Sequence, residues 1–253
     1  MVRASAPAAR SGSWEAARSR LIVALDVSTR ARALTLVERL HGRPGFFKVG
    51  SRLFTAAGPG IVRALVELGE RVFLDLKYHD IPHIVADACV EAANLGVSLI
   101  TVHTAGGPRM LRAAREALEK HRPAGRRPRL LGVTLLTSLD AREVKHIGFA
   151  GSVAENVVRL ARLAGRNGCD GVIAAPTDVA ALRRACGPDF LIVTPGIRRA
   201  GRRKASDQKR VATVAQAVYA GADYLVVGRA IIDSRAPTRA FDALAEEFAA
   251  ALD

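Results

Sequence analysis

Three charged residues follow an apolar run that is typical of a buried strand. The run covers residues 72–74, and after it come Asp75, Lys77 and Asp80, just before Ile81-Pro82. Residues two apart on a strand share a face, so we expect Asp75 and Lys77 to lie side by side at its end. Removing a carboxylate and an ammonium group from water costs several kcal/mol per ion. A fold does not need that cost, but a reaction can use a fixed acid next to a fixed base.

The elements that must position these residues alternate along the chain. Short apolar runs predict strands at 21–26, 46–49, 71–76, 98–103, 129–135, 170–175, 190–194 and 223–227. Amphipathic patterns predict helices at 29–41, 52–68, 82–95, 107–121, 152–167, 177–186, 208–220 and 238–251. Strands that are apolar on both faces indicate a parallel sheet covered by helices. Eight strand–helix units predict an α/β fold of one domain, a closed (β/α)8 TIM barrel over residues 21–253.

The alternative architecture is a doubly wound open sheet. Its dinucleotide-binding form carries Gly-x-Gly-x-x-Gly after the first strand, and this chain has no such motif there. Two long connections, 136–151 and 195–207, interrupt the predicted repeat. Long loops in a compact fold are usually lids or binding loops.

Residues 1–20 are rich in Ala, Ser and Arg and contain one acidic residue, Glu15. They lack the apolar segment of a secretory signal peptide. We expect a disordered N-terminal extension, and an organelle transit peptide is the alternative.

The composition narrows the function class. The net charge is +14, and the basic residues are 32 Arg and only six Lys. A basic nucleic-acid-binding barrel is one interpretation. However, the arginines are spread over most predicted helices and the twelve aromatic residues are not interleaved with them, so we expect no nucleic acid partner.

No apolar run is long enough to span a membrane. Cys89, Cys169 and Cys186 have no metal-ligand spacing and predict reduced thiols in a cytoplasmic protein.

In a barrel of this kind the functional residues lie where strands end and loops begin. Asp26, Lys48, Asp75 and Lys77 stand at the ends of three consecutive strands, so their charges could alternate in one cluster. Each charge would then have an opposite neighbour, which makes its burial tolerable. A structural ion-pair cluster is the alternative interpretation.

Gly228 and Arg229 follow the eighth predicted strand, where barrels of this class often bind a phosphate. Glycine lets the backbone approach an anion, and arginine offers a forked donor. Arg198, after Pro195-Gly196 in the loop that follows the seventh strand, could close on the same anion. These residues predict a phosphorylated substrate.

Three histidines, His79, His83 and His103, raise the alternative of a metal site. Neither His79 nor His83 has a partner at metal-ligand spacing, so we expect no metal. No nucleophile-elbow motif supports Ser-His-Asp catalysis.

The segment Asp75-Leu-Lys77-Tyr-His-Asp80-Ile-Pro82 resembles the signature of the orotidine 5'-phosphate decarboxylase family, in its bacterial form. The resemblance covers about residues 20–250. It is supported by Val23-Ala-Leu-Asp26, Phe47-Lys-Val-Gly50, Leu135-Leu-Thr-Ser138, Val193-Thr-Pro-Gly-Ile-Arg198 and Val227-Gly-Arg229. It implies the decarboxylation of orotidine 5'-phosphate to UMP, the last step of pyrimidine nucleotide synthesis, by a cytoplasmic homodimer without cofactor or metal.

The resemblance also implies a role for each matching residue. Lys77 would protonate C6 of the pyrimidine, Asp75 would face the substrate carboxylate, and Lys48 with Asp26 would complete the charged array and hold the ribose. Asp80, with Ile81, would reach into the neighbouring subunit's site. The remaining substrate contacts would come from Thr137, Ser138, Arg198, Gln208, Gly228 and Arg229.

Other activities stay open at this point. Hexulose-phosphate synthases and gulonate-phosphate decarboxylases share the Asp-x-Lys-x-x-Asp core but use Mg²⁺. Thr137-Ser138 and the long loop ending at Gln208 favour a pyrimidine nucleotide instead. A fusion with a phosphoribosyltransferase is a further alternative, and residues 1–20 are too few to supply that domain.

Overall fold

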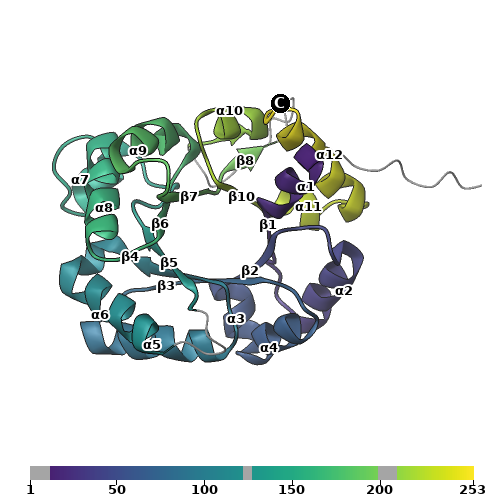
Figure 1. Ribbon diagram of the computed structural model, residues 1–253, viewed down its shortest axis with the longest axis horizontal. Helices are drawn as coiled ribbons and strands as arrows, with labels where there is room; N and C mark the ends of the chain where they lie inside the picture. The colour runs from purple at the N-terminus through teal and green to yellow at the C-terminus, as the bar shows by residue number, and fades with distance from the viewer. Residues whose placement is uncertain (1–11, 122–126, 199–209) are drawn as a thin grey trace, which may run out of the picture.

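Eight parallel strands form a closed barrel whose spatial order follows the chain (Figure 1). The computed structural model describes residues 12–121, 127–198 and 210–253. The barrel strands are β1 (Leu21–Ala24), β2 (Phe46–Gly50), β3 (Val72–Tyr78), β4 (Leu99–His103), β5 (Arg129–Val133), β6 (Gly171–Ile173), β7 (Leu191–Thr194) and β10 (Tyr224–Val227). β10 pairs with β1 and closes the barrel, which confirms the predicted TIM barrel and excludes the open sheet.

Helices surround the strands on the outside (Figure 1). They are α1 (Gly12–Ser19), α2 (Arg30–Leu40), α3 (Ser51–Ala57), α4 (Gly60–Glu67), α5 (Pro82–Asn94), α6 (Gly107–Lys120), α7 (Ala141–His146), α8 (Val153–Arg166), α9 (Val179–Cys186), α10 (Val214–Tyr219), α11 (Arg229–Ile232) and α12 (Pro237–Ala249). Short 3-10 turns, η1 (Thr104–Gly106) and η3 (Pro176–Asp178), precede α6 and α9.

The structure divides one predicted helix and shortens another. The segment 52–68 forms α3 and α4, because Gly58 adopts a left-handed φ of 65° and Pro59 follows it. The described part of 208–220 becomes helical only at Val214, where the Thr213 side chain caps the first turn.

Both long connections contain structure that the sequence did not reveal. Asp140 caps α7 within 136–151, in a reciprocal capping box with Glu143. After β7, the two-residue strand β8 (Ile197–Arg198) pairs in parallel with β9 (Ala212–Thr213). The carboxyl side of β7 is therefore extended by a small second sheet.

The expectation of a disordered extension is wrong for its second half. Gly12–Ser19 form helix α1, which lies against α12 (Figure 1). Trp14 and Ala17 are buried there, at 8% and 0% exposure. Burying an indole ring removes a large apolar area from water, which orders a segment whose composition alone suggests disorder. Residues 1–11 lie outside the described part of the chain.

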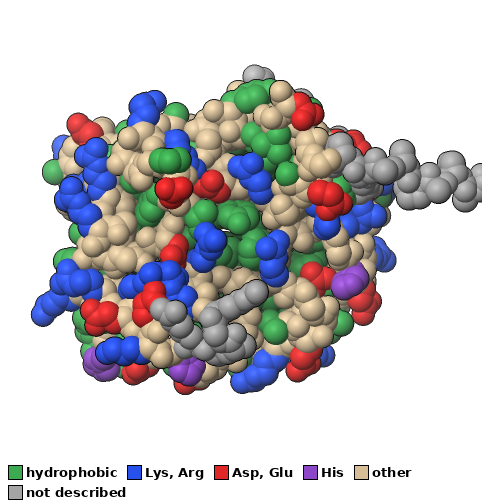
Figure 2. All heavy atoms as spheres, viewed as in Figure 1, with side chains coloured by type: hydrophobic (Ala, Val, Ile, Leu, Met, Phe, Trp, Pro, Cys, Tyr) green, Lys and Arg blue, Asp and Glu red, His purple; other side chains and the backbone are tan. Residues whose placement is uncertain are grey.

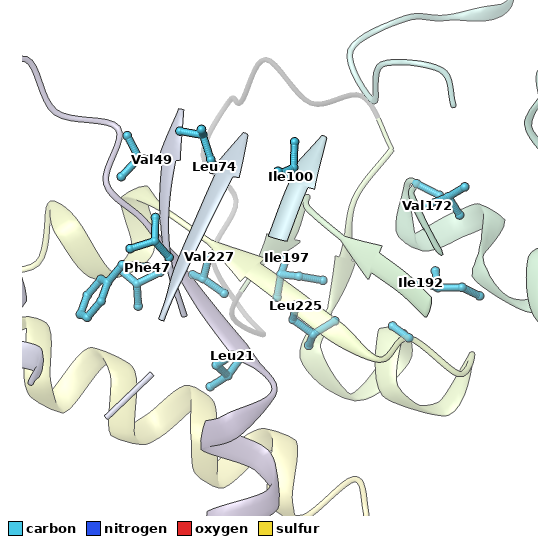
Figure 3. Close-up of a cluster of buried hydrophobic side chains, with 14 of the residues drawn as sticks. Leu21, Phe47, Val49, Leu74, Ile100, Val172, Ile192, Ile197, Leu225 and Val227 are labelled. Carbon is cyan, nitrogen blue, oxygen red and sulfur yellow. The ribbon is translucent and has the colours of Figure 1, made fainter. Parts of the chain in front are cut away.

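Two apolar layers flank each strand. Outward side chains such as Phe47, Leu74 and Ile100 pack in the cluster between strands and helices (Figure 3). Inward side chains form a separate interior cluster, which consists of Ile22, Ala24, Phe46, Phe73, Leu99, Leu131, Val193 and Val226. Because strand side chains alternate with a period of two, the next inward positions on β2, β3 and β4 are Lys48, Asp75 and Thr101. Polar groups therefore sit directly above an apolar floor inside the barrel.

Charged side chains are dispersed over one face of the barrel. On the face shown in Figure 2, Lys and Arg side chains are interspersed with Asp and Glu. None of the described helices is both long enough and apolar enough to cross a bilayer.

Candidate active site

Four side chains of alternating charge meet at the carboxyl ends of β1, β2 and β3. The Lys48 Nζ atom lies 3.1 Å from Asp26 Oδ1 and 3.4 Å from Asp75 Oδ2. The Lys77 Nζ atom lies 2.8 Å from the same Asp75 Oδ2. The structure confirms the predicted grouping, and we call Asp26, Lys48, Asp75 and Lys77 the charge array.

Burial differs sharply within the charge array. The side chains of Lys48 and Asp75 are 10% and 11% exposed, whereas Lys77 is 32% exposed and Asp26 is 50% exposed. The buried members are therefore held between partly open ones, and the open ones are accessible to a ligand.

The array keeps its buried members charged. Burial acts to lower the pKa of the Lys48 amine, but Asp75 and Asp26 outweigh burial and raise that pKa above its ordinary value. Burial acts to raise the pKa of the Asp75 carboxyl, but Lys48, Lys77 and Thr101 outweigh it and hold that pKa below its usual range. A fixed carboxylate beside fixed ammonium groups can repel one anion and stabilise charge that develops nearby.

Lys77 reaches the array through an irregular stretch of β3. The pairing with β4 runs from Leu74 opposite Ile100 to Tyr78 opposite Val102, so β3 advances four residues while β4 advances two. Lys77 has a φ of 54°, the only left-handed non-glycine residue among those described. Such a conformation costs about 1 to 3 kcal/mol and is concentrated at functional sites. The expected side-by-side placement of Asp75 and Lys77 is correct, but regular strand alternation is not its cause.

Thr101 on β4 fills the gap that this bulge leaves. Its hydroxyl accepts a hydrogen bond from the Lys77 backbone N–H at 2.9 Å and donates one to Asp75 Oδ1 at 3.0 Å. The residue is fully buried.

Gly50 leaves space for the array, and Gly228 lies next to it. A Cβ atom at Gly50 would lie 2.8 Å from Lys48 Nζ and 3.4 Å from Asp26 Oδ1. A Cβ atom at Gly228 would lie 3.7 Å from Asp26 Oδ2. Gly228 therefore brings the expected anion-binding segment against the charge array.

The other expected anion-binding residues lie at the same end of the barrel. Gly228 precedes α11, and Arg229 is the first residue of that helix and is exposed. Arg198 is half-buried on β8, after Gly196 with its left-handed φ of 88°. β8 lies next to β10, the strand that ends at Val227.

Only some of the loop residues that we expect to contact the base lie within the described part of the chain. Thr137 is half-buried and Ser138 is exposed, both in the connection from β5 to α7. Gln208 lies outside the described residues. Arg210, just after it, forms an ion pair with Asp178 and donates to the Leu136 carbonyl oxygen at 3.3 Å. Arg210 thus joins the connections that follow β5, β6 and β7.

Asp80 and Ile81 lie at the start of α5, and within the described part of the chain neither forms a hydrogen bond or ion pair with the array. Both are exposed, Ile81 at 55%, and Asp80 Oδ1 accepts a hydrogen bond from the Ile81 N–H at 2.6 Å. The structure therefore does not bring these two residues together with the other expected site residues of the same chain.

The three histidines do not share one place. The rings of His79 and His103 lie 5.4 Å apart beside the array, while His83 is exposed on α5. Burial, and then His79 and Lys77, lower the pKa of His103 below its ordinary value. Among the residues that the structure describes, no three His, Cys, Asp or Glu side chains are grouped so that they could hold a metal ion.

Comparison with known proteins agrees with this geometry. The model of the "Orotidine 5'-phosphate decarboxylase / HUMPS family" matches residues 19–244. The chain belongs to this family. Two relatives named orotidine 5'-phosphate decarboxylase are similar to this chain along nearly all of their own length. The one from Geobacter sulfurreducens is 49% identical over 92% of this chain and 98% of its own, and the one from Trichlorobacter lovleyi is 48% identical over 92% and 97%.

Two solved structures share the fold of this chain. Orotidine 5'-phosphate decarboxylase from Lactobacillus acidophilus superposes with a TM-score of 0.81 at 37% identity, over 90% of this chain and 98% of that one. An uncharacterized conserved protein from Geobacillus kaustophilus gives 0.79 at 38% identity, over 90% and 99%.

Sequence reasoning missed several residues around the site of this family member. Thr101 was read only as part of a strand, although its place two residues after Leu99 puts it on the inward face. Arg52, whose guanidinium donates to the Asp26 carbonyl oxygen at 3.1 Å, and Arg210 gave no signal in the sequence.

Proposed function

We propose that this chain is an orotidine 5'-phosphate decarboxylase, which converts orotidine 5'-phosphate to UMP in the last step of pyrimidine nucleotide synthesis. The observation that carries the proposal is the charge array, with Lys77 Nζ 2.8 Å from a buried Asp75 carboxylate, beside the Gly228-Arg229 segment. The relatives that are 46 to 49% identical over more than nine-tenths of this chain carry the same activity in their names.

A residue of the charge array can be assigned to each step of the decarboxylation. The C6–carboxylate bond breaks, carbon dioxide leaves, and the bonding electron pair remains on C6. The Lys77 ammonium stabilises that charge and then delivers its proton to C6. Asp75 faces the departing carboxylate and repels it in the bound substrate. Lys48 and Asp26 keep the array charged and hold the ribose.

Residues distant from the reacting carbon bind the rest of the substrate. Arg198, Gly228 and Arg229 bind the phosphate, and Thr137, Ser138 and Gln208 contact the base and neighbouring groups. Binding energy from a remote phosphate can be used to position the reacting carbon. The chemistry needs no cofactor, because the array itself supplies the cation and the proton.

An absorbance assay with orotidine 5'-phosphate tests this function. Wild type should convert the orotate chromophore to that of UMP, and Lys77→Ala should not. Retention of the chromophore in the presence of wild-type protein would refute the proposal.

The assay also separates the decarboxylase from the Mg²⁺-dependent sugar-phosphate enzymes that share the Asp-x-Lys-x-x-Asp core. Activity on orotidine 5'-phosphate should be unchanged in EDTA. A requirement for added Mg²⁺ would favour the sugar-phosphate activities instead.

We also propose a homodimer in which Asp80 and Ile81 complete the partner's site. Ile81 and Ile84 are 55% and 44% exposed, and they form an apolar surface beside the exposed Asp80 carboxylate. Such a surface on a single chain is typical of a contact between subunits.

Mixing two inactive variants tests the exchange of residues. Subunits with Lys77→Ala and subunits with Asp80→Asn should each be inactive alone. A mixed dimer contains one site with both Lys77 and Asp80 intact, so re-equilibrated equal mixtures should recover about a quarter of wild-type activity. No recovery, although mixed dimers form, would place both residues in the same chain's site.

A cytoplasmic location remains part of the proposal. Cys89, Cys169 and Cys186 are free thiols. Burial raises the pKa of the Cys89 and Cys169 thiols to about 12, so both are poor nucleophiles.

A further inference from the structure

We propose that Thr101 is a positioning residue that sets the geometry of Lys77 and Asp75 through its single hydroxyl group. The proposal rests on the decarboxylase function and adds to it a residue on β4, a strand that supplies no member of the charge array.

The first argument is the backbone of Lys77. The bulge in β3 removes Lys77 from regular pairing with β4, and its N–H donates to the Thr101 side chain at 2.9 Å instead. A backbone N–H that is buried without an acceptor costs as much as a lost hydrogen bond. Thr101 therefore supports the left-handed conformation at Lys77 that turns this side chain toward Asp75.

The second argument is that the two oxygens of the Asp75 carboxylate have different partners. Thr101 donates to Oδ1 at 3.0 Å, while Oδ2 faces Lys48 at 3.4 Å and Lys77 at 2.8 Å. A carboxylate held only at Oδ2 can rotate about its terminal bond, because such bonds have broad torsional minima. The Thr101 hydroxyl fixes the plane of the carboxylate, and with it the oxygen that faces the substrate.

The third argument is that the Thr101 hydroxyl acts as a donor and as an acceptor at the same time. A threonine has one O–H to donate and lone pairs to accept. At Thr101 the proton goes to Asp75 and a lone pair receives the Lys77 N–H. The side chain is 0% exposed, so water does not compete for either bond. A hydroxyl that links the Lys77 backbone to the Asp75 carboxylate in this way holds the two residues relative to each other.

Three variants test the proposal in the full-length protein. Thr101→Val keeps the shape and removes the hydroxyl, Thr101→Ser keeps the hydroxyl, and Thr104→Val is the matched control. Thr104 is also 0% exposed, but its hydroxyl has no hydrogen-bond partner among the described residues. Turnover of orotidine 5'-phosphate is measured for each variant, as kcat and KM, from pH 4 to 9.

Thr101→Val should lower kcat by about 10- to 100-fold, the range for losing a hydrogen bond to a charged group, with KM nearly unchanged. The loss should be equal on orotidine, which lacks the phosphate, because Thr101 acts at the reacting carbon. The acidic limb of the kcat profile should move to higher pH, because Asp75 has lost a donor. Thr101→Ser should stay within about threefold of wild type, and Thr104→Val within about twofold.

Two results would overturn the proposal. Wild-type kcat with an unmoved pH profile in Thr101→Val would show that the hydroxyl positions nothing. Equal losses in Thr101→Val and Thr101→Ser would assign the effect to the lost shape. If Thr101→Val does not fold, Thr101→Ala and Thr101→Ser replace it as the pair, since they differ only in the hydroxyl. Inactive wild type would refute the decarboxylase function itself, so the two failures are distinguishable.

Discussion

The Oδ2 atom of Asp75 lies 2.8 Å from the Nζ atom of Lys77, although the backbone between the two residues departs from regular strand geometry. The contact closes a chain of two acids and two bases that starts at Asp26 and passes through the buried Lys48. Each charge in the chain stabilises the next. The members at the two ends are the more exposed ones, so a substrate can contact the array without breaking its buried centre.

Replacing Lys48 and Lys77 one at a time should show that Lys48 contributes more to the free energy of unfolding than Lys77 does. Lys48→Met removes the 10% exposed cation between Asp26 and Asp75 and should lower the free energy of unfolding by about 3 kcal/mol. Lys77→Met removes a cation that is 32% exposed and should cost about 1 kcal/mol. Urea unfolding at pH 7.5 measures both values.

The activity of the same variants provides the control. Both should lose at least about 100-fold in kcat, since each removes a fixed charge beside the reacting group. Equal losses of stability in Lys48→Met and Lys77→Met would contradict the burial order on which this prediction depends.

The barrel could be predicted from the sequence because its signals are local. Each of the eight predicted strands is a mostly apolar run of four to seven residues, and the helices between them have regular amphipathic spacing. Asp26, Lys48, Asp75 and Lys77 could be grouped because parallel strands in a barrel all end on one face.

The remaining features depend on contacts between distant residues. Helix α1, which carries the buried Trp14, packs against α12 at the other end of the chain. The left-handed Lys77 depends on Thr101, 24 positions away, and no local rule places a lysine in that conformation. Arg210 contacts Asp178 and Leu136 across three connections, so its partners could not be read from its neighbours.

Gly50→Ala should impair catalysis more than stability. The added Cβ would lie 2.8 Å from Lys48 Nζ, so the ammonium group must move by several tenths of an ångström within the array. A misplacement of about 1 Å at an active site can cost about 100-fold in rate, and we expect a loss of about 10- to 100-fold in kcat. Steady-state assays of Gly50→Ala against Gly60→Ala, where an added Cβ meets nothing within 4 Å, measure the effect. A similar loss in both variants would mean that the approach to Lys48 is not the cause.

Arg229→Ala should weaken phosphate binding and spare the reacting carbon. Losing a charge-assisted hydrogen bond to phosphate should lower kcat/KM for orotidine 5'-phosphate by about 10- to 100-fold. Turnover of orotidine, which lacks the phosphate, should be nearly unaffected. Arg235→Ala, an exposed arginine just after α11, is the matched control and should change neither value. Equal losses of Arg229→Ala on both substrates would place Arg229 at the reacting carbon instead.

The folded protein should lose stability as the pH falls below about 6.5, in part through His103. Burial, His79 and Lys77 lower the pKa of His103 in the folded state, and Asp75 only partly opposes them. The unfolded chain then binds more protons than the folded one between that lowered pKa and the ordinary histidine value of about 6.5. Stability rises with pH wherever the unfolded state binds more protons, so this contribution is complete above pH 7 and is lost on acidification.

Urea unfolding at pH 5, 6, 7 and 8 measures this contribution. The free energy of unfolding should fall less steeply on acidification in His103→Asn than in wild type. His146→Asn, at an exposed position at the end of α7, should keep the wild-type fall. An unchanged fall in His103→Asn would assign the pH dependence to other groups.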